Sequence, residues 1–285
     1  MITYYQKRKN NLYKLTYYSS LFALILFFNF SCKKGCTDPN ASNYDPTAKK
    51  ENNTCEYDSS STETNISLIT FHYYDSDSFY LDSIYQDDFG NTIKFSRANF
   101  YFGNPRYYNS NGQNIASSNS YSLISSTETI YDFGDAPTDL INTMDVIIGV
   151  DSITNHIDPA NYSSSNALAY QSPSMHWQMG TNTQNWSYLF IVLEGQVDID
   201  GNGTFDSGET FVYHIGGDDF RAEINAINWN PPINQLATYT IEIDINWANF
   251  VNNIDISSDV FTHTMDNIPL ATIISTNAIT VISEH

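Results

Sequence analysis

Alternation of hydrophobic and polar residues dominates the chain from Ile66 onward. Short segments rich in β-branched and aromatic side chains are separated by clusters of Gly, Asn, Asp, Ser and Pro, which is typical of strands joined by turns. The clearest is Tyr239–Ile245, where three isoleucines share one face and two acidic residues share the other. Roughly ten such segments without long helices between them predict one all-β domain, an antiparallel β-sandwich. Only Thr138–Asn142 and Asn267–Asn277 are predicted to form short helices.

The N-terminal residues follow a different pattern. Four basic residues precede the apolar run SSLFALILFFNFSC, which ends at Cys32. A basic segment followed by an apolar run too short for a clear membrane span is typical of a secretory signal. With its serine before the cysteine and two lysines after it, this signal resembles bacterial lipoprotein signals common in Bacteroidota. The resemblance implies removal of residues 1–31 and lipidation of Cys32, whose acyl chains would anchor the protein to a membrane. An ordinary signal peptide with a chance cysteine is the alternative.

Two further cysteines follow in the exported part of the chain. Cys36 and Cys55 are an even pair, and we expect them to form a disulfide. The segment Gly35–Tyr57 resembles a short motif of secreted proteins from marine Bacteroidota, G-C-T-D-P-x-A-x-N-Y-D-P. Closing a loop of about 20 residues would stabilise it by roughly 3 kcal/mol. The sequence therefore predicts a disulfide-stapled spacer at 32–57, a polar linker at 58–65 and the β-sandwich domain at 66–285.

The acidic net charge of the chain limits the classes of molecule that it can bind. The chain carries 32 acidic against 12 basic residues, a net charge of −20. This balance argues against nucleic acid, whose phosphates require basic patches. It suits cation binding, although the acidic surface of any exported protein explains it equally well.

A twelve-residue acidic loop, Asp198–Glu209, has the spacing of a calcium-binding loop. Side-chain oxygens fall at positions 1, 3, 5, 9 and 12, a glycine falls at position 6, and a backbone carbonyl is available at position 7. The residues concerned are Asp198, Asp200, Asn202, Gly203, Thr204, Asp206 and Glu209. The flanking segments favour strands over helices, so we expect a Ca²⁺ loop between two strands. A plain Asx/Gly hairpin turn is the alternative.

Several motifs occur in a characteristic order within the domain. They are NFYFGNPRYYNSNGQ (99–113), IIGVDSITNHIDPA (147–160), Met175-His176-Trp177, YLFIVLEG (188–195), His214-Ile215-Gly216 and THTMDNIPLATIISTNA (262–278). Together they resemble the MbnP-like family of exported copper-binding domains over about 66–285. The resemblance implies a β-sandwich that binds copper through histidines and, in some members, contains an oxidised tryptophan. It makes His214 and Trp177 copper-site candidates. His176 is a third candidate, at the position before Trp177 where the family usually has Phe or Tyr. Gly217 occupies the position after His214-Ile215-Gly216 where the family often has a cysteine.

The histidines themselves give a compatible but less specific picture. Imidazole is the expected ligand for copper, and two imidazoles with Met175 or Met265 would suit Cu(I). Five histidines are available if the fold gathers them, namely His72, His156, His176, His214 and His263. Their spacing forms no local metal motif. For any one of these histidines, the alternative is a structural role, with the ring hydrogen-bonded to the backbone. For Trp177 and Trp186, the alternative is that both are aromatic residues of the sandwich core.

The chain contains no G-x-S-x-G, Walker or H-E-x-x-H motif, so we expect no enzymatic activity. The sequence thus predicts an exported, lipid-anchored metal-binding protein of the cell envelope, an outer-membrane lipoprotein facing the periplasm or the cell surface. Copper is its implied ligand, with Ca²⁺ bound as a structural ion. Two alternatives stand beside this hypothesis: a calcium-stabilised cell-surface binding or adhesion module, and an accessory lipoprotein of an outer-membrane uptake complex with a transporter partner.

Overall fold

The computed structural model describes residues 33–37, 43–52, 54, 63–137, 141–178, 186–228 and 239–285. They belong to two compact units, Met1–Ser61 and Thr62–His285. Within the described ranges, no helix has the length and apolar character needed to span a bilayer.

In the described residues of the first unit, β1 (Lys34–Gly35) and β2 (Lys50–Glu51) form a small parallel pair. Asp45 forms an ion pair of 2.7 Å with Lys33. Hydrogen bonds from Lys33 and Thr47 lower the pKa of Asp45 to about 2.

Of the three cysteines predicted to be lipidated or disulfide-bonded, only Cys36 lies in the described part of the chain, and it is buried. Cys32 and Cys55 lie outside the described residues. The lipidation and the disulfide therefore stay predictions.

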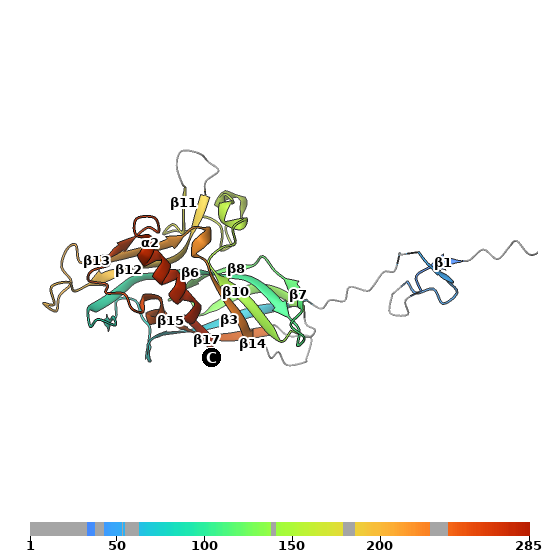
Figure 1. Cartoon of the computed structure of the whole chain (residues 1–285), viewed down its shortest axis with the longest axis horizontal. Helices are drawn as coiled ribbons and strands as arrows, with labels where there is room; N and C mark the ends of the chain where they lie inside the picture. The colour runs from blue at the N-terminus through green and yellow to red at the C-terminus, as the bar shows by residue number, and fades with distance from the viewer. Residues whose placement is uncertain are drawn as a thin grey trace, which may run out of the picture. The chain divides into compact units, whose positions relative to one another are not determined.

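The second unit is built from two sheets, which confirms the predicted all-β sandwich (Figure 1). The larger sheet has the order β14-β10-β6-β12-β13-β16, with β11 paired to β12 and with β5, β7 and β8 paired to β6. Its strands are β5 (Tyr85–Gln86), β6 (Thr92–Tyr108), β7 (Asn114–Ser117), β8 (Tyr121–Ser125), β10 (Thr143–Ile148), β11 (His176–Gln178), β12 (Trp186–Val197), β13 (Thr210–Gly216), β14 (Ala222–Asn228) and β16 (Phe261–Thr262).

The smaller sheet has the order β17-β15-β3-β4, with β9 paired to β3. Its strands are β3 (Glu63–Tyr74), β4 (Asp77–Ser78), β9 (Ile130–Pro137), β15 (Tyr239–Asn246) and β17 (Ile282–Glu284). β3 begins at Glu63, so the last three residues of the predicted linker lie in a strand. Two pairs in this unit are parallel, β3 with β15 and β13 with β16, which strand alternation alone does not predict.

The predicted C-terminal helix is present as α2 (Ile268–Asn277). It begins after Asn267, whose side chain accepts a hydrogen bond from the Leu270 amide at 3.2 Å. In the other predicted helix, residues 138–140 lie outside the described part, and Ile141 and Asn142 are not helical. Short 3₁₀ turns complete the unit: η1 (Thr154–His156), η2 (Pro159–Asn161), η3 (Asp218–Phe220), η4 (Trp247–Val251) and η5 (Ala278–Thr280).

The core is centred on β6 and β12, which lie side by side in the larger sheet. Residues 187–193 of β12 are all buried, as expected for a central strand covered on both faces. Only glycine fits at position 195, because a Cβ there would lie 2.1 Å from the Lys94 carbonyl oxygen. The register shifts between Glu194 and Gly195, and this bulge ends the apolar run at a charged side chain.

Candidate metal sites

Two histidines meet where β13 and β16 run parallel. The register pairs Val212 with Phe261 and Tyr213 with Thr262. The residues that follow these pairs are His214 and His263, so the parallel register places the two histidines side by side. Their rings stack with centroids 4.8 Å apart and planes 16° from parallel. Burial and the neighbouring His214 lower the pKa of His263, so this imidazole stays neutral to a more acidic pH than usual.

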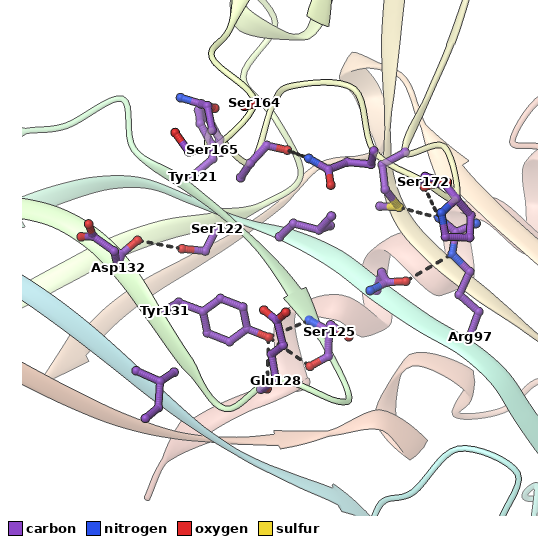
Figure 2. A pocket seen from close by; sticks show the side chains of 18 residues that line it. Arg97, Tyr121, Ser122, Ser125, Glu128, Tyr131, Asp132, Ser164, Ser165 and Ser172 are labelled. Carbon is purple, nitrogen blue, oxygen red and sulfur yellow. Dashed lines mark hydrogen bonds between the residues drawn. The ribbon is translucent and has the colours of Figure 1, made fainter.

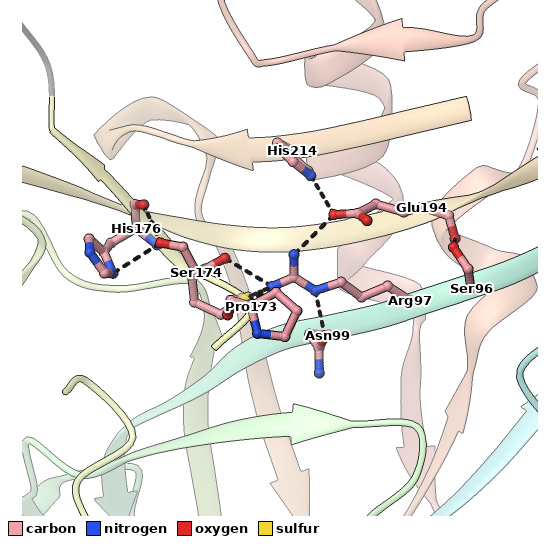
Figure 3. Close-up of polar contacts among 9 residues, drawn as sticks. Ser96, Arg97, Asn99, Pro173, Ser174, His176, Glu194 and His214 are labelled. Atoms are coloured by element: carbon pink, nitrogen blue, oxygen red, sulfur yellow. Dashed lines mark hydrogen bonds and ion pairs between the residues drawn. The ribbon is translucent and has the colours of Figure 1, made fainter. Parts of the chain in front are cut away.

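A carboxylate on β12 orients the first of these histidines. Glu194 accepts a hydrogen bond from His214 Nε2 at 2.8 Å and another from Arg97 Nη1 at 3.0 Å (Figure 3). These partners, His214 first, lower the pKa of Glu194. Since the carboxylate only accepts, the His214 proton lies on Nε2, and in the neutral ring Nδ1 carries the lone pair. A carboxylate that fixes the tautomer in this way is typical of metal-binding histidines.

Trp177 lies beside this histidine pair. Its ring centroid is 6.5 Å from that of His263. It packs on Gly216, where a Cβ would lie 3.2 Å from the indole. The buried indole nitrogen of Trp177 has no hydrogen-bond partner among the described residues, and the same is true of Trp186. Both indoles line a cavity of about 280 Å³ that Met265 also borders.

His156 borders the same cavity from η1. Its Nδ1 donates a hydrogen bond to the Trp186 carbonyl oxygen at 2.8 Å, and its Nε2 lies 3.2 Å from Asp218. The carbonyl contact, and then Asp218, raise the pKa of His156. Both ring nitrogens are thus already engaged by oxygen atoms.

His176 does not join His214. Successive residues of a strand point to opposite faces, so His176 and its neighbour Trp177 diverge. The His176 ring contacts Tyr170 and Trp186, with centroids 4.8 and 5.4 Å away. Figure 3 shows it directed away from the Glu194–His214 pair. Burial lowers its pKa.

The other candidate side chains are separated in the fold. His72 is structural, because its Nδ1 accepts a hydrogen bond from the Trp247 indole at 3.1 Å and its Nε2 contacts the Glu128 carbonyl oxygen at 3.0 Å. Met175 is buried, with its sulfur 3.0 Å from Arg97 Nη2. Met265 is 64% exposed and follows His263 by two residues.

The acidic loop connects β12 to β13, so the prediction of a loop between strands is confirmed. Oxygens of Asp198, Asp200 and Glu209 lie within 4.8 Å of one another, and in the part of the chain that the structure describes this is the one such group of three His, Cys, Asp or Glu ligands. Asp198 accepts from the Gly203 amide at 2.8 Å, and Glu209 from the Asp206 amide at 2.7 Å. Asp198 and Glu209 are buried although both are acidic.

The remaining predicted loop ligands lie at its exposed tip. The Asn202 amide group donates to Asp200 at 3.0 Å and to Asp206 at 3.3 Å. The Thr204 hydroxyl donates to Asn202. All of the side chains chosen from spacing therefore belong to one connected group.

Sequence reasoning missed Glu194 as the partner of His214. It named His263 as one of five available histidines but did not place it beside His214. The available signal for Glu194 was a charged residue directly after the apolar run 188–193. No local signal marks His263, because its position depends on the β13–β16 pairing.

The MbnP family matches residues 63–268. The chain belongs to the MbnP family. Among solved structures, it is similar to MbnP from Methylosinus trichosporium, with 9% identity, a TM-score of 0.43, and coverage of 66% of this chain and 77% of that chain. No curated protein matches the sequence.

Proposed function

We propose that this MbnP-family protein is an exported, lipid-anchored carrier that binds copper at His214 and His263. The observation that carries the proposal is the contact of 2.8 Å between Glu194 and His214 Nε2, which leaves Nδ1 as the metal-binding atom beside a second imidazole. Membership of the MbnP family supports copper as the metal.

The donor set fits copper chemically. Imidazole nitrogen suits both copper oxidation states, and a thioether favours Cu(I). Met265 is exposed and close in sequence to His263, so it is the natural third ligand. The Trp177 indole lies beside His263 and would limit access of water from that side. His176 contacts other residues, so its loss should leave copper binding nearly unchanged.

The test is metal analysis of the purified full chain after copper loading and dialysis. We expect about one copper per chain, from two imidazoles and one further ligand. His214→Gln and His263→Gln should each lose it, while His285→Gln, an exposed histidine paired with Asp244, should retain it. Circular dichroism of each variant reports whether the fold persists. Copper at background in the loaded wild-type protein, or retained in both single variants, would overturn the proposal.

Calcium is the second metal of the proposal, bound as a structural ion by the loop Asp198–Glu209. Support comes from the close oxygens of Asp198, Asp200 and Glu209, since Ca²⁺ prefers several carboxylate and carbonyl oxygens. Saturating Ca²⁺ at about 100 times its Kd would stabilise the fold by about 2.7 kcal/mol. Thermal unfolding with Ca²⁺ and with EGTA measures this.

A matched pair of variants locates the effect. Asp200→Asn should abolish the stabilisation by Ca²⁺, whereas Asp77→Asn, in an exposed strand elsewhere, should not. Equal melting temperatures with Ca²⁺ and with EGTA would contradict Ca²⁺ binding and favour the alternative, an Asx/Gly hairpin turn that binds no ion. Because this loop and His214 share the β12–β13 hairpin, we also expect Ca²⁺ to raise copper affinity; identical affinities with and without Ca²⁺ would contradict that coupling.

The proposal includes no catalytic step. It places the protein in the envelope, held by the Cys32 lipid and facing the periplasm or the cell surface. Binding of calcium without copper would instead favour a surface binding or adhesion module. Co-purification with an outer-membrane transporter would favour an accessory role in uptake.

A further inference from the structure

A second, separate cavity lies on the β8 and β9 side of the domain. Its volume is about 580 Å³, and it is an open groove bordered by β6, β8, β9 and the segment 164–175 (Figure 2). A neighbouring hollow of about 280 Å³ shares Arg97, Asn99, Ser125 and Pro173 with it. We call the two together the polar groove. None of the histidines lines it. Its size is that of sites for small ligands, about 300–1,000 Å³.

The larger cavity is lined mainly by neutral groups that can form hydrogen bonds. It contains five serines, two tyrosines and three carboxamides. Hydroxyls donate and accept, and carboxamides offer both kinds of group. Apolar atoms of Leu123, Ile130 and Pro173 lie among them. This mixture matches a ligand that has both hydroxyl groups and C–H surfaces.

Charge excludes an acidic ligand. The one arginine of the groove, Arg97, is already committed to Glu194, to Asn99 at 3.2 Å and to the Ser174 carbonyl oxygen at 2.9 Å (Figure 3). The carboxylates of Glu128 and Asp132 also line the larger cavity. An anion would therefore meet negative charge without a free cation.

Several hydrogen-bonding groups of the groove are held in place with capacity to spare. Gln171 donates through Nε2 to the Ala167 and Ala169 carbonyl oxygens, which fixes its amide and leaves Oε1 to accept. Asn166 accepts from the Leu168 amide through Oδ1, which leaves its NH₂ group to donate. In the smaller hollow, the buried Ser126 hydroxyl has no partner among the described residues.

We propose that the polar groove binds a neutral oligosaccharide of about two or three sugar units. Ring hydroxyls bond to the serine and carboxamide groups, and the C–H faces lie against Leu123, Ile130 and Pro173. Arg97 keeps the loop 173–175 in place as one wall. No histidine lines the groove, so sugar binding is measured without copper, and neither result decides the other.

Isothermal titration calorimetry of the purified full chain in detergent tests the proposal. The probes are maltotriose, cellotriose, xylotriose and triacetylchitotriose, with trigalacturonate and tetra-alanine as an acidic sugar and a peptide. We expect at least one neutral trisaccharide to bind and both other classes to fail. No binding by any neutral trisaccharide, or binding of the peptide or the acidic sugar instead, would overturn it.

Variants then locate the binding. Ser164→Trp fills the groove from an exposed position, and it should weaken binding by about tenfold or more, because the ligand loses its space. Ser110→Trp, an exposed turn residue outside the groove, is the matched control and should bind normally. Glu128→Gln keeps the shape of the side chain and should weaken binding severalfold, because hydrogen bonds to a carboxylate are about twice as strong as neutral ones. Unchanged binding in both groove variants would contradict the assignment.

Discussion

Replacing Arg97 with glutamine removes the central ion pair of the larger sheet. Arg97 and Glu194 are direct cross-strand partners, and the Arg97 side chain is only 14% exposed. The substitution loses the contact of 3.0 Å to Glu194 and that of 2.9 Å to the Ser174 carbonyl oxygen. Removing one partner of a buried pair costs about 3–5 kcal/mol. Glu194 is 29% exposed and keeps His214, so we expect a loss of about 2–3 kcal/mol for Arg97→Gln.

A second arginine of the same strand provides the control. Arg106 is 34% exposed, and its ion pairs with Asp145 and Glu223 measure 3.9 and 3.6 Å. Exposed pairs of this kind contribute at most about 1 kcal/mol, so Arg106→Gln should cost no more. Urea unfolding followed by tryptophan fluorescence gives both free energies. A loss below about 1 kcal/mol for Arg97→Gln, or equal losses for the two variants, would refute this account of the Arg97 network.

Two further predictions concern the core. Burial lowers the pKa of His72 below its usual 6.5, so between 6.5 and the lower folded value the unfolded chain binds a proton that the folded chain does not. Stability should therefore fall as the pH drops through this window, and urea midpoints of His72→Gln should depend less on pH than those of the wild type; identical slopes would contradict this. Gly195→Ala should cost about 3 kcal/mol or more, since its Cβ would lie 2.1 Å from the Lys94 carbonyl oxygen. Gly112→Ala, in open space at φ 73°, should cost only about 1 kcal/mol, and similar melting temperatures for the two variants would argue against the close approach.

Features that depend on neighbouring residues were predictable from the sequence. Strand alternation led to the all-β sandwich, and the spacing from Asp198 to Glu209 led to a connected acidic loop between two strands. The period of two along a strand also implies that His176 and Trp177 face opposite ways, so they could not both approach His214.

Features that depend on distant pairing were not predictable. His263 reaches His214 only because β16 runs parallel to β13. Glu194 contacts Arg97 through the register of β12 with β6. The polar groove likewise combines β8, β9 and the segment 164–175, which follows β9 only after β10. No local sequence pattern predicts that these elements border one cavity.

The parallel pairing of β3 with β15 also sets an order for folding. β3 opens the domain, whereas its partner β15 begins only at Tyr239. Until that residue is available, β3 has only β4 and β9 beside it, and the edge that β15 will cover stays open. Closing such a long loop is slow because its entropy is lost before the contacts form. The smaller sheet therefore lacks its central pairing until the last fifth of the chain has been made, and until then the open edge of β3 is a place where another strand could pair.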